Sequence, residues 1–289
     1  MMFRNSLHNK CSLGLAILSL ALHGSVWQGQ AQVITLSHNN SIAQIDLSNP
    51  NPSSVGMFNW LVQGQSELHQ QWFWFRVGNN PEQPINAISP PVFSTFLGSR
   101  GLATTYGNAA FSLEVDYQLT GGSVVAANQV AQSDIQETIS IHNISGAPLD
   151  FHLFQYSDFD LAGPGNDTIT LGTDPSGRFN SANQSDGFST LTESVSVAAP
   201  SASHGEAAFF NATFLKLNNG APDVLNDNPS AGPGNVTWAL EWDMLLNPND
   251  TFIISKDKHL AVQIVPEPSS VALISLGIFA GCLCRRRRK

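Results

Sequence analysis

Three aspartates near the middle of the chain are the residues best suited to hold a metal ion. Asp158 and Asp160 alternate at the end of a predicted strand, and Asp167 follows the Gly-rich stretch 163–166. Because Ca²⁺ prefers carboxylate and carbonyl oxygens, we expect a calcium site at Asp158, Asp160 and Asp167. Their spacing fits no EF-hand loop, and hydrogen bonding within turns is the simpler alternative for these side chains.

Two pairs of carboxylates are spaced to lie on one face of a strand. Glu114 and Asp116 form one pair, and Glu241 and Asp243 form the other. Two neighbouring carboxyl groups can act as the acid and base of a glycosidase. A solvated strand face shows the same spacing without any chemistry, and we favour that interpretation.

The histidines are scattered, and only His142 and His152 lie on strands predicted to be neighbours, where they could form a zinc or catalytic pair. The chain has no Gly-x-Ser-x-Gly, His-Glu-x-x-His, Gly-x-x-x-x-Gly-Lys or Cys-x-x-Cys motif. We therefore predict a protein that is not an enzyme, with a secreted hydrolase as a less favoured alternative.

An aromatic run, 72–75, places two rings on each face of a predicted strand. An exposed pair of rings could stack on sugars, but burial in a core is the simpler interpretation. Together with the calcium prediction, this run makes a calcium-dependent carbohydrate-binding module the second candidate function.

A period of two residues dominates the segments that must position these groups. Apolar and polar residues alternate over 111–118, 138–142, 149–154 and 236–243, which is typical of half-buried strands. We expect one hairpin between 138–142 and 149–154, around Ser145-Gly146, and another between 236–243 and 252–255. The stretches 176–187 and 222–230 are rich in Asn, Ser, Gly and Pro and predict surface loops.

No long helical stripe interrupts this pattern between Gln32 and Val265. The fold class that we predict is mainly β, an antiparallel β-sandwich of Ig-like or jelly-roll type over residues 32–264. Its only helices would be an N-terminal signal helix and one C-terminal transmembrane helix.

Charge and cysteine content limit the partners of this domain. Residues 32–267 hold six basic residues against all 22 acidic ones, a net charge of −16, which disfavours binding to nucleic acid. The three cysteines are Cys11, Cys282 and Cys284, so the domain has no disulfide and depends on its core for stability.

The N-terminal segment, 1–31, has the three parts of a signal peptide. Arg4 and Lys10 precede an apolar stretch, 11–22, and a small-residue cleavage pattern ends at Ala31. We predict cleavage between Ala31 and Gln32 after export by the Sec machinery, with a buried N-terminal helix as the alternative.

The C-terminal segment, 265–289, combines a proline break, an apolar helix and a basic cluster. Pro266 and Pro268 keep the chain extended, and the apolar residues 269–284 then predict a transmembrane helix. At 1.5 Å per residue this helix spans about 24 Å, slightly less than the hydrocarbon core. The basic tail is expected to stay cytoplasmic and to place the domain outside, and it consists of Arg285, Arg286, Arg287, Arg288 and Lys289.

In this order, Val265, Pro266, Glu267 and Pro268, the helix and the basic tail resemble the PEP-CTERM sorting domain of Gram-negative exosortase substrates. The resemblance implies that an exosortase-type membrane transpeptidase recognises the motif and removes the helix. The domain would then pass from the cytoplasmic membrane to the cell surface or matrix. A permanent anchor without processing is the alternative.

The function that we predict is therefore non-catalytic binding or assembly at the cell surface. No cofactor other than calcium is expected, and extracellular polysaccharide is the partner that such a location suggests.

Overall fold

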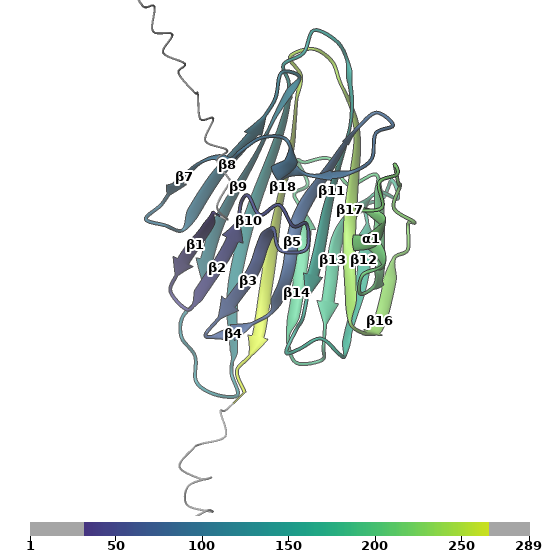
Figure 1. The fold of residues 1–289 in the computed structure, drawn as a ribbon. Helices are drawn as coiled ribbons and strands as arrows, with labels where there is room; N and C mark the ends of the chain where they lie inside the picture. The colour runs from purple at the N-terminus through teal and green to yellow at the C-terminus, as the bar shows by residue number, and fades with distance from the viewer. Residues whose placement is uncertain (1–31, 266–289) are drawn as a thin grey trace, which may run out of the picture.

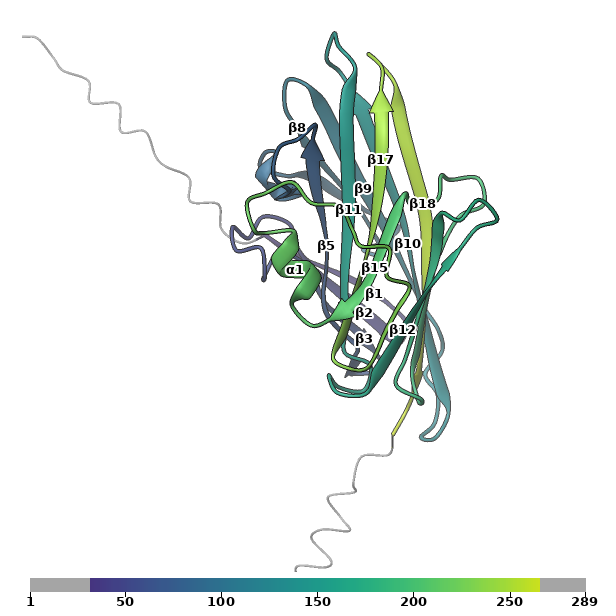
Figure 2. The ribbon, with the colours of Figure 1, turned by 90° about the vertical axis from the view of Figure 1, so that its right-hand side faces the viewer.

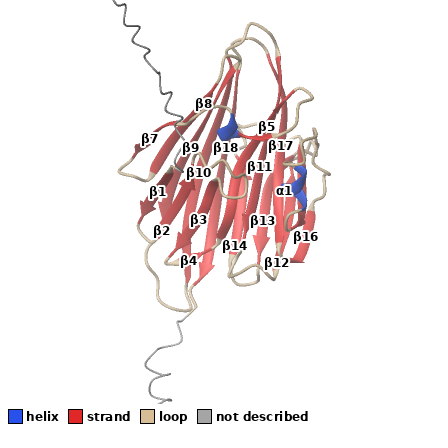
Figure 3. Cartoon of the chain, viewed as in Figure 1, coloured by secondary structure: helices blue, strands red, loops and turns tan. Residues whose placement is uncertain are grey.

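The computed structural model describes residues 32–265, which form two antiparallel nine-stranded sheets packed face to face (Figures 1 and 3). The strands form where the sequence alternates. In β9 (Phe111–Gly121) every second residue is buried, as the period of two predicts. The mainly β class and the two-layer architecture are confirmed.

Sheet A has a seven-strand path with two short strands attached. Its order is β1 (Val33–His38), β2 (Ser41–Asp46), β3 (Gly56–Val62), β5 (Leu68–Val77), β11 (Leu149–Phe159), β17 (Val236–Leu246) and β15 (His204–Phe209), with β4 (Gln65–Ser66) on β3 and β6 (Gln83–Pro84) on β5.

Sheet B has an unbranched path of nine strands. Its order is β16 (Ser230–Gly234), β12 (Asp167–Thr173), β13 (Phe179–Ser185), β14 (Thr190–Val195), β18 (Thr251–Gln263), β10 (Val130–Asn143), β9, β8 (Gly101–Gly107) and β7 (Val92–Phe96). An immunoglobulin or jelly-roll domain has seven to nine strands in total, so this sandwich is larger than the expected type.

Both predicted hairpins are wrong. β10 and β11 are consecutive in the chain, but β10 pairs with β9 and β18 in sheet B, whereas β11 pairs with β5 and β17 in sheet A. β17 and β18 are divided between the sheets in the same way. The short connections cross from one sheet to the other. The prediction failed because alternation indicates which face of a strand a residue occupies and carries no information on which strand lies beside it.

The predicted loop at 176–187 is also wrong, because β13 occupies residues 179–185. This strand lies between β12 and β14, which satisfy its backbone hydrogen bonds despite its Asn- and Ser-rich sequence. The other predicted loop, 222–230, is largely irregular. Its exceptions are Asn228, which forms an isolated bridge with Glu206, and Ser230, which is the first residue of β16.

The core between the sheets is aromatic and also contains charge. Phe75 on β5, Phe111 on β9 and Phe151 on β11 pack together with ring centroids 5.0 to 6.0 Å apart. Phe75 stacks on Phe151, and Phe111 meets both rings edge-on. Elsewhere in the core, Glu137, Glu193, Lys256 and Lys258 form a buried set of ion pairs, here called the core quartet, and Lys256 Nζ lies 5.3 Å from the centre of the Phe73 ring.

The face of sheet A directed away from sheet B, here called the outer face, is partly covered. The helix α1 (Ala212–Lys216) lies against it (Figure 2), and Phe214 packs edge-on against Trp74 at 6.0 Å. A 3₁₀ turn, η1 (Ile85–Ala87), buries Ile85. The covering segments thus form a third, incomplete layer.

The predicted signal peptide with its cleavage point, the transmembrane helix and the basic tail lie outside the described residues. Within residues 32–265, no helix is long and apolar enough to cross a membrane.

Candidate functional site

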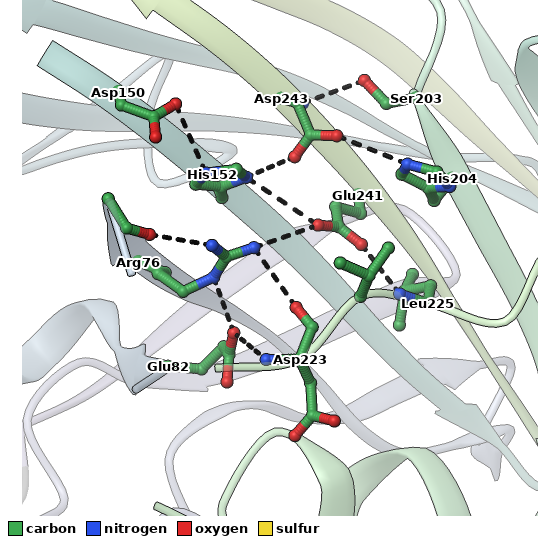
Figure 4. Close-up of polar contacts among 12 residues, drawn as sticks. Arg76, Glu82, Asp150, His152, Ser203, His204, Asp223, Leu225, Glu241 and Asp243 are labelled. Carbon is green, nitrogen blue, oxygen red and sulfur yellow. Dashed lines mark hydrogen bonds and ion pairs between the residues drawn. The ribbon is translucent and has the colours of Figure 1, made fainter. Parts of the chain in front are cut away.

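Five polar side chains meet on the outer face of sheet A, and we call them the outer-face cluster (Figure 4): Arg76, His152, His204, Glu241 and Asp243. Strand register brings them together. His152 on β11 lies opposite Arg76 on β5 and opposite Asp243 on β17, and Glu241 lies opposite His204 on β15. Four strands separated widely in the sequence therefore supply one site.

The inner end of the cluster is buried and is held by ion pairs and hydrogen bonds. Arg76 Nε donates to Glu82 Oε1 at 2.8 Å, and its Nη2 lies 3.6 Å from Glu241 Oε1. The loop after α1 closes over this pair, since Arg76 Nη2 donates to the carbonyl oxygen of Asp223 at 3.2 Å and the Leu225 amide donates to Glu241 Oε2 at 2.9 Å. Buried charge of this kind is stable only with such partners.

The outer end of the cluster reaches solvent. The side chains of His152, His204 and Asp243 are 13%, 31% and 33% exposed. His152 Nδ1 hydrogen-bonds Asp243 Oδ1, and His204 Nε2 lies 3.5 Å from Asp243 Oδ2. The exposed part of the cluster therefore offers both donors and acceptors to a ligand.

The two carboxyl groups of β17 have opposite pKa shifts. Burial is the main cause that raises the pKa of Glu241 to about 8, and the nearby Asp243 charge adds to it. Burial acts in the same direction on Asp243, but the hydrogen bond and charge of His152 outweigh it and lower the pKa of Asp243. At neutral pH Glu241 thus holds a proton and Asp243 is ionised.

The pair Glu241 and Asp243 was predicted to share a strand face, and it does. The predicted solvated face is wrong for Glu241, because the segment after α1 buries it completely. The other pair, Glu114 and Asp116, lies on β9 in sheet B, where Glu114 is exposed and accepts a hydrogen bond from Thr105.

The predicted pairing of His142 with His152 is wrong. His142 lies on β10 in sheet B and hydrogen-bonds Thr251, whereas His152 lies on β11 in sheet A. The error follows from the predicted hairpin, which joined strands that belong to different layers.

Asp158, Asp160 and Asp167 lie in one region with Glu67, and burial raises the pKa of Asp158 to about 7 and of Glu67 to about 7. One buried oxygen each of Glu67, Asp158 and Asp167 has no hydrogen-bond partner, while the other oxygen of each accepts a hydrogen bond. Asp174, by contrast, accepts hydrogen bonds in its own turn from Ser176.

The aromatic run Trp72 to Phe75 packs into the protein, as core burial predicts. Trp72, Phe73 and Trp74 are fully buried, and Phe75 stacks on Phe151. These rings cannot form an exposed sugar-stacking platform.

Arg76 and His204 were not identified from the sequence. Neither belongs to a motif, and each is brought to the site by pairing between distant strands. The one available signal was composition, because Arg76 is among only six basic residues of the domain.

A family model for the PEP-CTERM protein-sorting motif matches residues 265–289. The chain carries a PEP-CTERM sorting motif. The match covers the same residues, 265–289, whose order of motif, apolar segment and basic tail resembles this sorting domain. A PEP-CTERM motif implies a protein that is exported, sorted by an exosortase-type enzyme and delivered by way of the membrane to the cell surface.

Solved structures share the fold of the domain in this PEP-CTERM protein. A bacterial glucoamylase complexed with acarbose aligns over 86% of this chain and 36% of its own, with TM-score 0.50 and 10% identity. A galactose mutarotase-like protein from Lactobacillus casei ATCC 334 aligns over 79% of this chain and 100% of its own, with TM-score 0.50 and 10% identity. At such identity the likeness concerns the fold alone. No curated protein matches the sequence.

Proposed function

We propose that the exported domain binds a neutral saccharide of the cell surface or matrix through the exposed end of the outer-face cluster, without catalysis. The observation that carries this proposal is the convergence of His152, His204 and Asp243, each partly exposed and each held by the strands beneath. Saccharide sites use a few fixed donors and acceptors of this kind.

Charge and fold support the choice of ligand. The net charge of −16 over residues 32–267 repels anionic polymers and leaves neutral ones unaffected. The structures that share the fold include one complexed with acarbose and one described as galactose mutarotase-like.

Isothermal titration calorimetry against a panel of neutral and anionic polysaccharides tests the proposal. We expect a neutral polysaccharide to bind, Asp243→Asn and His204→Ala to weaken binding about 10-fold or more, and His259→Ala to leave it unchanged. His259 is a matched control because it pairs with Asp134 at 2.7 Å on the other sheet. Failure of every neutral polysaccharide to bind would overturn the proposal.

A second candidate function is proton transfer on the bound sugar. It is favoured by the opposed pKa shifts of Glu241 and Asp243, because such a pair supplies one acid and one base at the same pH. Because Glu241 is buried, its proton would reach the sugar through Asp243, and Glu241→Gln would then abolish turnover, such as interconversion of sugar anomers followed by NMR, while saccharide binding persists.

The calcium site at Asp158, Asp160 and Asp167 remains a proposal and would make saccharide binding calcium-dependent. Calorimetry with millimolar calcium tests it directly, and no heat of binding would remove it.

A further inference from the structure

The feature that carries a further inference is a set of three potential metal ligands in the outer-face cluster. One ligand atom each from His152, Glu241 and Asp243 lie within 4.8 Å of one another, and no other such group of His, Cys, Asp or Glu occurs in residues 32–265. Register explains the convergence, since Glu241 and Asp243 are two residues apart on β17 and Asp243 lies opposite His152.

A buried carboxylate oxygen points into this group without a hydrogen-bond donor. Glu241 Oε2 accepts from the Leu225 amide, but Glu241 Oε1 is buried and accepts no hydrogen bond. Its cationic neighbours are Arg76 Nη2 at 3.6 Å and His152 Nδ1 at 3.9 Å, and the Asp243 carboxyl group shares a hydrogen bond with the Glu241 side chain. A buried oxygen normally accepts a hydrogen bond, so this atom would be available as a ligand once Glu241 is ionised.

The two histidines are oriented as metal ligands usually are. His152 directs Nδ1 toward Asp243 and Nε2 toward Asp150 Oδ1, 3.4 Å away. His204 directs Nε2 toward Asp243 and Nδ1 toward Asp227 Oδ2, 3.0 Å away. Each ring thus turns its inner nitrogen toward the Asp243 carboxylate, His152 toward Oδ1 and His204 toward Oδ2, and its outer nitrogen toward a second carboxylate, which resembles the second-shell arrangement of metal-bound imidazoles.

The surrounding charge favours a cation. The positive charge of Arg76 is already matched by Glu82 at 2.8 Å. Asp150 and Asp227 add negative charge at the rim, and no Lys or Arg other than Arg76 makes an ion pair with the cluster among the described residues.

We propose that the outer-face cluster binds one divalent transition-metal ion, with His152, Glu241 and Asp243 as ligands and with His204, which lies beside Asp243 outside this group of three, turning in as the fourth. Mixed imidazole and carboxylate ligands suit Zn²⁺ better than Ca²⁺. When the ion binds, Glu241 would release its proton to solvent, and each imidazole would be neutral, with its inner nitrogen unprotonated and its outer N–H directed toward Asp150 or Asp227.

The test uses zinc alone on the exported domain, so that it does not depend on the proposed saccharide. After treatment with EDTA and dialysis, calorimetry with ZnCl₂ should show one ion per chain. Co²⁺ should give the visible absorption of a four-coordinate site, which a merely structural His–Asp pair would not produce.

Matched variants decide which residues hold the ion. Glu241→Gln and His204→Asn should each weaken zinc binding 10-fold or more. Asp150→Asn and Asp227→Asn should weaken it by at most about 100-fold. His259→Ala, which removes a histidine of a separate His–Asp pair, should leave binding unchanged. Because His204 is partly exposed, its variant tests the site even if the Glu241 variant fails to fold.

Absence of zinc binding, or equal binding by wild type and His204→Asn, would overturn the metal site. The saccharide proposal fails separately, when zinc binds and no neutral polysaccharide does.

Discussion

The side chain of Gln155, on β11, donates through Nε2 to Glu193 Oε2 at 2.9 Å, on β14 of the opposite sheet. This hydrogen bond joins the two layers inside the sandwich. Glu193 also faces Lys258 Nζ at 2.9 Å, and Lys258 faces Glu137 Oε1 at 2.7 Å. The core quartet is therefore a buried polar network, in a domain that has no disulfide.

Removing one member of the core quartet should destabilise the domain strongly. Lys258→Met leaves Glu137 and Glu193 with too little positive charge, and we expect a loss of about 3–5 kcal/mol in the free energy of unfolding. Denaturant unfolding measures it. His259→Ala, one residue along on the same strand but partly exposed, should cost less than about 1 kcal/mol. Equal losses in the two variants would show that the quartet is not important for stability.

The acidic region around Asp158 should make the domain less stable as the pH rises. Burial raises the pKa of Asp158 to about 7, so the folded state holds this proton more tightly than the unfolded chain. Stability is then greatest below the unfolded pKa near 4 and falls as the pH rises through about 7.

Asp158→Asn should remove part of this dependence, because the amide cannot ionise. We expect the variant to gain about 2 kcal/mol relative to wild type at pH 8 and little at pH 4, after allowing for partial solvation. Guanidinium titrations at the two pH values provide the measurement. A gain of the same size at both would show that ionisation is not the cause.

Helix α1 should control the outer-face cluster from a distance. Phe214→Ala removes the ring that packs on Trp74 and Tyr156, and we expect the free energy of unfolding to fall by about 1–3 kcal/mol. The segment after α1 brings Leu225 to Glu241, so saccharide and zinc binding should also weaken. Phe210→Ala is the control, because Phe210 is 44% exposed and lies just before the helix. Unchanged binding in Phe214→Ala would show that the helix does not hold the site.

The sorting motif should determine where the chain ends after export. In native cells we expect the mature protein to begin near Gln32 and to end near Pro266 to Pro268. Glu267→Ala should leave the basic tail intact in the membrane fraction, and Glu241→Gln should be processed normally. Intact mass and peptide mapping of both fractions give the answer. A wild-type protein that retains Arg285 to Lys289 would contradict processing.

Local periodicity was sufficient to find most of the strands that it was applied to. Over 236–243 it placed Trp238 and Trp242 on one face of β17 and Glu241 with Asp243 on the other. In the structure the two tryptophans are buried, and Glu241 and Asp243 lie on the outer face. The same pattern contains no information on the neighbouring strand. Both hairpins failed for this reason, and with them the pairing of His142 and His152.

The candidate site depends on contacts that have no local signature. Arg76 lies at the end of an aromatic strand, and His204 begins a short one far along the chain. Burial of Glu241 involves Leu225, which lies in the stretch 222–230 whose composition predicted only a surface loop. Sequence reasoning therefore singled out three of the five residues of the cluster, His152, Glu241 and Asp243, and could not predict their environment.

The placement of β18 has a mechanical consequence. This strand is the last one before Val265 and the sorting motif, yet it lies inside sheet B, paired along its length with β10 and over six residues with β14. A pull on the chain beyond Val265 along the strand axis loads these two ladders in shear, so that many hydrogen bonds must break together. Tension from a surface tether is thus carried by the centre of a sheet and not by an edge that can peel away.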